Sequence, residues 1–157
     1  MSGDAPRGER PAFEVVVFDY EGVCTPSARE YIGDEAHRLP PLRPELSSVI
    51  AELRGRGTST ALLSNEFDRA WVSQIDGLSD FDHIFVGSDN RIFKPDRRAF
   101  ERVLYVVGCA PEQCLFVDDD EVNVRVARSI GCDAIHFDTS DVDASWAAVR
   151  SVCREPS

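Results

Sequence analysis

Short apolar runs alternate with longer amphipathic segments along this chain. The apolar runs predict strands that are buried on both faces, because consecutive apolar residues leave no polar face for solvent. They lie at residues 15–18, 58–63, 83–86, 114–117 and 134–137. The segments between them space apolar residues three and four positions apart, as on one face of a helix. The helices predicted from this spacing cover residues 44–53, 67–75, 96–107, 121–130 and 143–153, and the irregular stretch 24–43 leaves room for a short helix over 27–38.

This alternation predicts a Rossmann-like α/β domain with a doubly wound parallel sheet. Strands that alternate with helices form a three-layer α/β/α arrangement, in which right-handed crossovers join neighbouring parallel strands. The sequence contains no internal repeat and gives no sign of a second domain. We therefore expect one domain over residues 12–154, preceded by a disordered leader over residues 1–11.

Composition narrows the classes of function. The 157 residues include 17 basic and 28 acidic side chains, for a net charge of −11. This charge argues against nucleic acid and anionic membranes as partners, since both need a positive protein surface. No apolar run approaches the ~18 residues that cross a bilayer. The five cysteines are scattered and include no Cys-x-x-Cys pair, so we expect a reducing, cytoplasmic environment rather than a disulfide framework or a zinc site.

Polar side chains collect where the predicted strands end. In a parallel sheet these strand ends share one edge, which is where ligands of open α/β sheets bind. Crowded carboxylates resist ionisation unless a hard cation such as Mg²⁺ binds among them, and a lysine and a serine beside that cation would favour a phosphate. A carboxylate could then attack phosphorus, because the cation and the lysine offset the repulsion between two anions. The residues at this edge are Asp19, Glu21, Ser64, Lys94, Asp118 and Asp119.

Four short segments resemble the four motifs of the haloacid dehalogenase (HAD) superfamily and occur in the same order. They are residues 18–23 (Phe-Asp-Tyr-Glu-Gly-Val), 62–65 (Leu-Leu-Ser-Asn), 94–96 (Lys-Pro-Asp) and 116–119 (Phe-Val-Asp-Asp). Each segment lies at a predicted strand end or in the loop that follows, and the resemblance extends over about residues 13–137. It implies a Mg²⁺-dependent hydrolase, most similar to a phosphatase.

The resemblance also implies catalytic and substrate-binding roles. Asp19 would be the nucleophile that forms an aspartyl-phosphate, and Glu21 occupies the position of the general acid/base. Ser64 and the backbone of Asn65 would bind the phosphoryl oxygens. Lys94 would neutralise negative charge on the nucleophile and on the phosphate.

The metal site follows from the same resemblance. Asp119 would be a direct ligand of Mg²⁺, with Asp118 beside it as a ligand or as an orienting group. Asp19 and the backbone carbonyl of Glu21 complete the implied ligand set. Asn123 would hold this metal-binding loop in shape.

Each of these side chains also has a structural alternative. Asp19 could simply end a strand at a turn, and Ser64 could cap the next helix. Lys94 could be an ordinary surface lysine. The acidic run 118–121 could stabilise a helix N-terminus, which is the preferred interpretation for its last two residues.

Glu21 departs from the family pattern, because HAD phosphatases usually carry aspartate at this position. The additional methylene changes the position of a group that must reach the leaving oxygen, and an error on the order of 1 Å can cost ~100-fold in rate. Two alternatives to a phosphatase therefore stay open. One is a catalytically impaired domain that binds a ligand or regulates a partner, and the other is altered HAD chemistry such as dehalogenation or phosphoryl transfer.

The second departure concerns the cap that many HAD proteins insert after the first motif. Only residues 24–43 are available for it, and they carry three prolines. We therefore expect no developed cap domain and an open site. Such a site suits a large phosphorylated substrate, or a homo-oligomer in which a neighbouring subunit covers the site.

Overall fold

The structure is a computed structural model that describes residues 10–27, 30, 41–65 and 69–154. The leader expected over residues 1–11 lies almost entirely outside the described residues, and so does most of the short helix considered over 27–38. Most of the segment 24–43, on which the expectation of an absent cap depends, lies outside them as well.

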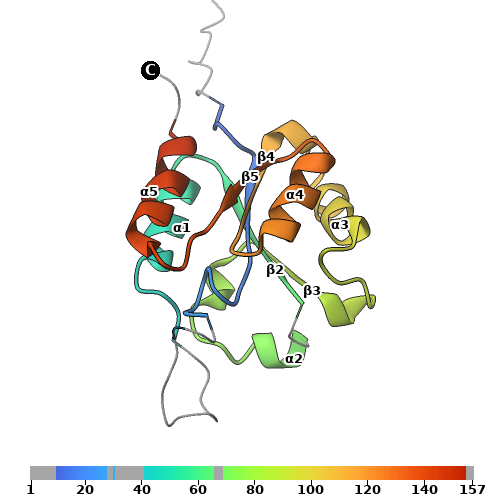
Figure 1. Ribbon diagram of the computed structural model, residues 1–157, viewed down its shortest axis with the longest axis horizontal. Coiled ribbons are helices and arrows are strands. Elements are labelled where there is room, and N and C mark those ends of the chain that lie inside the picture. The colour runs from blue at the N-terminus through green and yellow to red at the C-terminus, as the bar shows by residue number, and fades with distance from the viewer. Residues whose placement is uncertain (1–9, 28–29, 31–40, 66–68, 155–157) are drawn as a thin grey trace, which may run out of the picture.

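The described residues form a five-stranded sheet in the order β3-β2-β1-β4-β5, and every pairing in it is parallel (Figure 1). This confirms the predicted doubly wound α/β fold. β2 and β3 lie on one side of β1, and β4 and β5 lie on the other, so the strand order switches direction between β1 and β4. The strands are β1 (Val15–Phe18), β2 (Ser59–Ser64), β3 (His83–Val86), β4 (Cys114–Asp118) and β5 (Asp133–His136).

Helices cover both faces of the sheet. Figure 1 shows α1 and α5 on one face and α3 and α4 on the other. Their positions agree with the predicted helices, except that the segment predicted over 67–75 contributes only a short helix to the described residues. In the connections that the structure describes there are three 3₁₀ turns, η1 (Leu78–Asp80), η2 (Gly87–Asp89) and η3 (Pro111–Gln113). The α-helices are α1 (Leu46–Gly55), α2 (Arg69–Val72), α3 (Arg97–Val107), α4 (Glu121–Ser129) and α5 (Val142–Val152).

The core has two halves, one on each side of the sheet. Alternate residues of a strand point to opposite faces, so β1 contributes Val16 and Phe18 to one half and Val15 and Val17 to the other. The first half packs against apolar residues of α1 and α5, and the second against those of α3 and α4. β1 is buried on both faces, so its end is held in place by packing. The residues that follow β1 therefore start from a fixed position.

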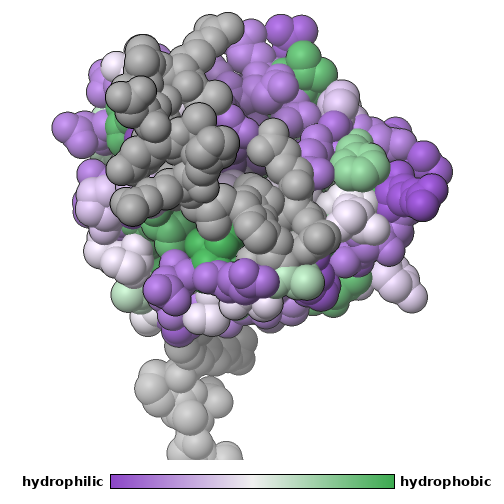
Figure 2. All heavy atoms as spheres, turned by 90° about the horizontal axis from the view of Figure 1, so that it is seen from below, coloured by the Kyte–Doolittle hydropathy of each residue, from purple (hydrophilic) through white to green (hydrophobic). Residues whose placement is uncertain are grey.

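The carboxyl ends of the strands point toward the lower side of Figure 1, which Figure 2 shows directly. The described surface on this side is mainly hydrophilic, with a small hydrophobic area, in keeping with the charge of the chain. Within the described ranges, no helix is both long enough and apolar enough to cross a membrane. All five cysteines are free thiols.

Candidate active site

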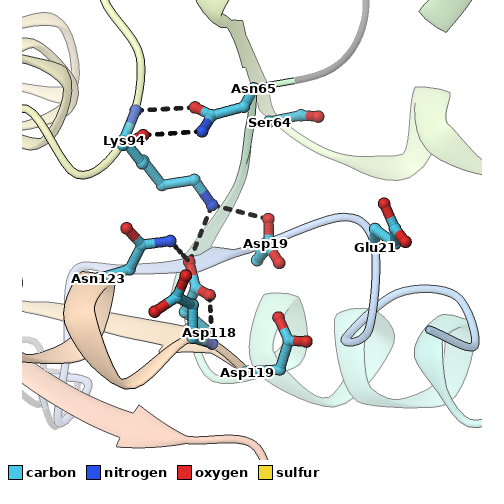
Figure 3. Close-up of a pocket in the computed structure, with 9 residues that line it drawn as sticks. Asp19, Glu21, Ser64, Asn65, Lys94, Asp118, Asp119 and Asn123 are labelled. Atoms are coloured by element: carbon cyan, nitrogen blue, oxygen red, sulfur yellow. Dashed lines mark hydrogen bonds and ion pairs between the residues drawn. The ribbon is translucent and has the colours of Figure 1, made fainter. Parts of the chain in front are cut away.

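Nine described residues line a pocket of about 230 Å³ at the carboxyl ends of the strands (Figure 3). The pocket lies at the ends of β1 and β4, where the strand order switches direction. Asp120 and Asn123, at the start of α4, are two of the nine. The other seven are those predicted to act in catalysis or to bind phosphate or metal, namely Asp19, Glu21, Ser64, Asn65, Lys94, Asp118 and Asp119, while Asn123 was predicted to hold the metal-binding loop in shape.

Lys94 joins the two central carboxylates of the pocket (Figure 3). Its Nζ donates to Asp19 Oδ1 at 2.7 Å and to Asp118 Oδ2 at 2.8 Å. The Lys94 side chain is only 3% exposed. Burial by itself lowers the pKa of a lysine, but the two carboxylates outweigh it here and raise the pKa of Lys94 above its ordinary value. Lys94 is therefore a fixed positive charge, and the surface alternative is excluded.

Burial has the largest effect on the pKa values of the three aspartates in the pocket. It raises the pKa of Asp19 from 3.8 to about 6, even though Lys94 acts in the opposite direction. Burial also raises the pKa values of Asp118 and Asp119. In addition, the pKa of each of the three carboxylates responds to at least one of the other two. The site thus concentrates negative charge that a single lysine does not balance.

This carboxylate cluster fits a divalent cation. Asp19, Asp118 and Asp119 each offer an oxygen, and these oxygens lie within 4.8 Å of one another. With all three carboxylates ionised and Lys94 protonated, the local charge is about −2, and hard oxygen ligands are those that Mg²⁺ prefers. The residues present therefore match the implied metal.

Asp118 is oriented by several protein donors besides Lys94. The backbone N–H of Asp120 donates to its Oδ1 at 2.9 Å, and Asn123 Nδ2 donates to its Oδ2 at 3.1 Å. Asp120 itself caps α4 by accepting a hydrogen bond from the N–H of Val122 at 2.8 Å. Within the acidic run, Asp118 therefore faces the pocket, while the side chain of Asp120 has the structural role.

Asp119 packs against the backbone of the loop that follows β1. Gly22 has φ 93°, and a Cβ built on it would lie 2.3 Å from Asp119 Oδ2. The carbonyl of Asp119 lies 2.9 Å from Nε2 of His136, at the end of β5. Position 22 therefore requires glycine both for its backbone conformation and for the space that the carboxylate occupies.

The side chain of Asn65 has a function that sequence reasoning missed. Its Oδ1 accepts a hydrogen bond from the backbone N–H of Lys94 at 2.7 Å, and its Nδ2 donates to the Lys94 carbonyl at 2.9 Å. This pair of bonds fixes the loop that carries the lysine. The Asn65 side chain thus binds the backbone of Lys94 with both its oxygen and its nitrogen. The phosphate-binding role that the resemblance implies concerns the backbone of Asn65, which these two bonds do not involve.

Ser64 and Glu21 complete the pocket. Ser64 ends β2 and is buried, while Glu21 forms an isolated parallel bridge with Thr25 in the loop after β1. In the view of Figure 3, Asp19 lies between Lys94 and Glu21. A group bound at Asp19 would therefore have the lysine on one side and the glutamate on the other.

The composition of the chain distinguishes Lys94 from its other basic residues. Lys94 is the only lysine of the chain, and the other 16 of its 17 basic residues are arginines. A compact ammonium on a flexible stem fits between two buried carboxylates, whereas the planar guanidinium of arginine needs more room. The one basic residue of the chain that is not an arginine thus lies in the pocket.

Comparisons with known proteins agree with this fold. The phosphoserine phosphatase of Thermus thermophilus is 34% identical over 105 residues, which cover 64% of this chain and 42% of that protein. The chain thus spans less than half the length of that relative. A protein from Porphyromonas gingivalis described as a predicted HAD-like family hydrolase has the same fold, with a TM-score of 0.71 at 19% identity over 92% of this chain and 100% of that chain.

A second solved structure with this fold is a HAD family enzyme from Bacteroides thetaiotaomicron in complex with magnesium and inorganic phosphate. Its TM-score is 0.67 at 17% identity, over 78% of this chain and 93% of that one. The sequence model of haloacid dehalogenase-like hydrolases matches residues 30–131, which are more than half of the chain and begin after Asp19 and Glu21. By this match, and in agreement with its fold, the chain belongs to the haloacid dehalogenase-like hydrolase family.

Proposed function

We propose that this protein hydrolyses phosphate monoesters through a covalent aspartyl-phosphate on Asp19 and depends on Mg²⁺. The observation that carries the proposal is the position of the Lys94 ammonium, 2.7 Å from Asp19 and 2.8 Å from Asp118, beside a third carboxylate, Asp119. The phosphatase among its relatives and the magnesium and phosphate bound to a structural neighbour support the same chemistry.

Asp19, Asp118 and Asp119 would hold the Mg²⁺, with the backbone carbonyl of Glu21 as a further proposed ligand. A bound Mg²⁺ would supply positive charge that draws the phosphate to the carboxylates and polarises the phosphoryl group. Asp118 has three protein donors to its oxygens, so Asp119 has more of its coordinating capacity left for the cation.

In the first step, a carboxylate oxygen of Asp19 attacks phosphorus and the bond from phosphorus to the ester oxygen breaks. The leaving oxygen takes its proton from Glu21, which becomes a carboxylate. Lys94 stabilises the negative charge on the nucleophile and on the phosphoryl oxygens, and the Ser64 hydroxyl donates to one of these oxygens. The pKa of Asp19, about 6 without metal, leaves this residue ionised at neutral pH.

In the second step, the Glu21 carboxylate takes a proton from water as that water attacks the phosphorus of the aspartyl-phosphate. The bond between Asp19 and phosphorus breaks, which releases inorganic phosphate and restores both carboxyl groups to their starting states. The extra methylene of Glu21 determines how far its carboxyl group extends from the backbone. The rate of both proton transfers therefore depends on where the loop after β1 places this residue.

The test is hydrolysis of p-nitrophenyl phosphate by the full chain, with Mg²⁺ and with EDTA in its place. We expect Mg²⁺-dependent release of p-nitrophenol, lost in Asp19→Asn and retained in Glu21→Asp. An absence of turnover in both the wild type and Glu21→Asp would contradict the proposal. Release of halide from 2-chloropropionate under those conditions would instead favour dehalogenation.

The proposed substrate is a phosphorylated compound. The open site that the short segment 24–43 predicts would also accept a large one. The net charge of −11 supports a partner other than nucleic acid or an anionic membrane. The five free thiols support a reducing compartment such as the cytoplasm. A homo-oligomer that covers the site is part of the same proposal, and gel filtration with light scattering tests it.

A further inference from the structure

A single arginine holds the loop that follows the proposed nucleophile. The backbone N–H of Arg43 donates to the carbonyl of Cys24 at 2.7 Å. Its guanidinium donates through Nε to the carbonyl of Val23 at 3.1 Å and through Nη2 to the carbonyl of Gly22 at 2.9 Å. Three consecutive carbonyls of the loop therefore accept hydrogen bonds from one residue.

These bonds satisfy groups that have no access to water. Val23 and Cys24 are fully buried, and Arg43 is 8% exposed. A buried carbonyl without a donor costs about 1–3 kcal/mol, so the loop depends on these donors to keep its present path. The guanidinium is held in turn by the Glu30 carboxylate, 2.9 Å from Nη2, and by the ring of Phe137, whose centroid lies 5.5 Å from Cζ.

The same loop carries two features of the active site. Glu21 lies directly before the three carbonyls, and Gly22 packs against the Asp119 carboxylate so closely that a Cβ would lie 2.3 Å from its Oδ2. Gly22 is also the residue whose carbonyl accepts from Arg43 Nη2. A shift of the loop at Gly22 therefore changes the position of Glu21 and the space around Asp119 together.

We propose that Arg43 is a positioning residue that sets the Mg²⁺ affinity and the acid/base geometry of the site through Gly22, an inference that rests on the proposed function. Among the described residues, the pocket is lined by nine others and not by Arg43, so this arginine acts behind the loop rather than on the substrate. The fork of the guanidinium is essential, because its Nε and Nη2 reach two adjacent carbonyls at once.

The test compares Arg43→Lys with the wild type, using the full chain freed of metal. The first readout is the apparent dissociation constant for Mg²⁺, taken from the rise of Tm with MgCl₂ concentration. Lysine keeps the charge but offers no fork, so we expect Mg²⁺ to bind ~10-fold or more weakly, as for other groups that orient metal ligands. In steady-state hydrolysis of p-nitrophenyl phosphate we expect kcat to fall ~10- to 100-fold while KM changes about twofold or less.

Glu30→Gln is the matched control, because it removes the charge that pairs with the guanidinium but leaves the bonds to the loop carbonyls. We expect its Mg²⁺ affinity and kcat to stay within about twofold of the wild type, since Glu30 is part of a partly exposed ion pair. If Arg43→Lys does not fold, Arg43→Gln replaces it, because its amide can still donate to one carbonyl.

Two results would overturn the inference. One is a folded Arg43 variant with lowered Tm but wild-type Mg²⁺ affinity and kcat, since that describes a purely structural residue. The other is a wild type whose Tm does not respond to Mg²⁺ at all. An absence of turnover in the wild type and in Glu21→Asp would defeat the proposed function alone, because the Mg²⁺ titration still decides whether Arg43 sets metal affinity.

Discussion

The backbone of Gly22 lies directly against the carboxylate of Asp119. A Cβ at position 22 would approach Oδ2 of Asp119 to 2.3 Å and its Cγ to 2.5 Å, distances that real Cβ contacts do not reach. Gly22 follows β1 and Asp119 follows β4, so this contact sets the separation of the two loops that form the metal site. The φ of 93° at Gly22 adds a second constraint, because residues with a Cβ rarely adopt it.

Gly22→Ala is therefore expected to weaken Mg²⁺ binding by ~10-fold or more, by displacing a carboxylate that we propose as a metal ligand. It should also destabilise the fold by about 1–2 kcal/mol through the left-handed backbone alone. Titration of Tm with MgCl₂ measures the first effect, and urea unfolding measures the second.

Gly108→Ala is the matched control for this change. Gly108 ends α3 with a φ of 78°, and a Cβ built on it meets no other heavy atom within 4 Å. It should lose a similar amount of stability and keep the wild-type Mg²⁺ affinity. Equal Mg²⁺ affinities in the two variants would show that the contact with Asp119 is not important for metal binding.

The raised pKa of Asp19 predicts a pH-dependent cost to the metal-free fold. The folded protein keeps the Asp19 proton up to about pH 6, whereas the unfolded chain releases it near the ordinary value of 3.8. Between these values the folded state binds more protons, so the contribution of Asp19 to the free energy of unfolding falls as pH rises. Over this window the loss is on the order of 2–3 kcal/mol.

Asp19→Asn removes this titration and still offers an acceptor to Lys94. In EDTA we expect the variant to be more stable than the wild type at pH 7 and to match it near pH 4, as measured by urea unfolding at both values. Mg²⁺ should stabilise the wild type more than the variant at pH 7. A stability difference that does not change with pH would contradict the raised pKa.

The two carboxylates beside Lys94 predict how its own pKa responds to mutation. Because Lys94 is the only lysine, selective ¹⁵N-lysine labelling gives one side-chain signal, which reports this ammonium alone. Asp118→Asn removes a charged partner 2.8 Å from Nζ, so the pKa of Lys94 should fall, as followed by NMR titration in EDTA.

Asp120→Asn provides the comparison for this experiment. Asp120 also lines the pocket, but its side chain caps α4 by accepting from the N–H of Val122. Its replacement should leave the Lys94 titration close to that of the wild type. Equal shifts in both variants would mean that general electrostatics, rather than the direct ion pair with Asp118, sets the pKa.

Residues that end strands are the part of the site that sequence could predict. The apolar runs determine where strands lie, and a parallel sheet brings their carboxyl ends to one edge, so Asp19, Ser64 and Asp118 could be placed together without coordinates. The predicted limits of β5 and α2 differ from those in the structure, because residues at the ends of an element contribute little to hydrophobic periodicity.

Contacts between residues that are distant along the chain could not be predicted from the sequence. The packing of Gly22 on Asp119 and the bonds of Asn65 to the backbone of Lys94 join segments that are distant along the chain and carry no periodic pattern. Arg43 gave no signal either, because a buried arginine that binds backbone carbonyls has the same sequence appearance as a surface arginine. Such residues are found only when the loops that they join are placed in three dimensions.

Trapping of the phosphoenzyme tests most directly whether Asp19 is the nucleophile. Glu21→Gln should slow the second step, in which water must lose a proton. The first step should still occur with p-nitrophenyl phosphate, because p-nitrophenolate is a good leaving group that departs without a proton from Glu21. Incubation with this substrate and Mg²⁺, followed by acid quenching, should therefore preserve the intermediate. Mass spectrometry is expected to find a phosphoryl group on Asp19, absent without Mg²⁺ and absent in Asp19→Asn. Turnover by the wild type with no phosphoryl group on Asp19 in the quenched variant, or with one on a different residue, would contradict the account.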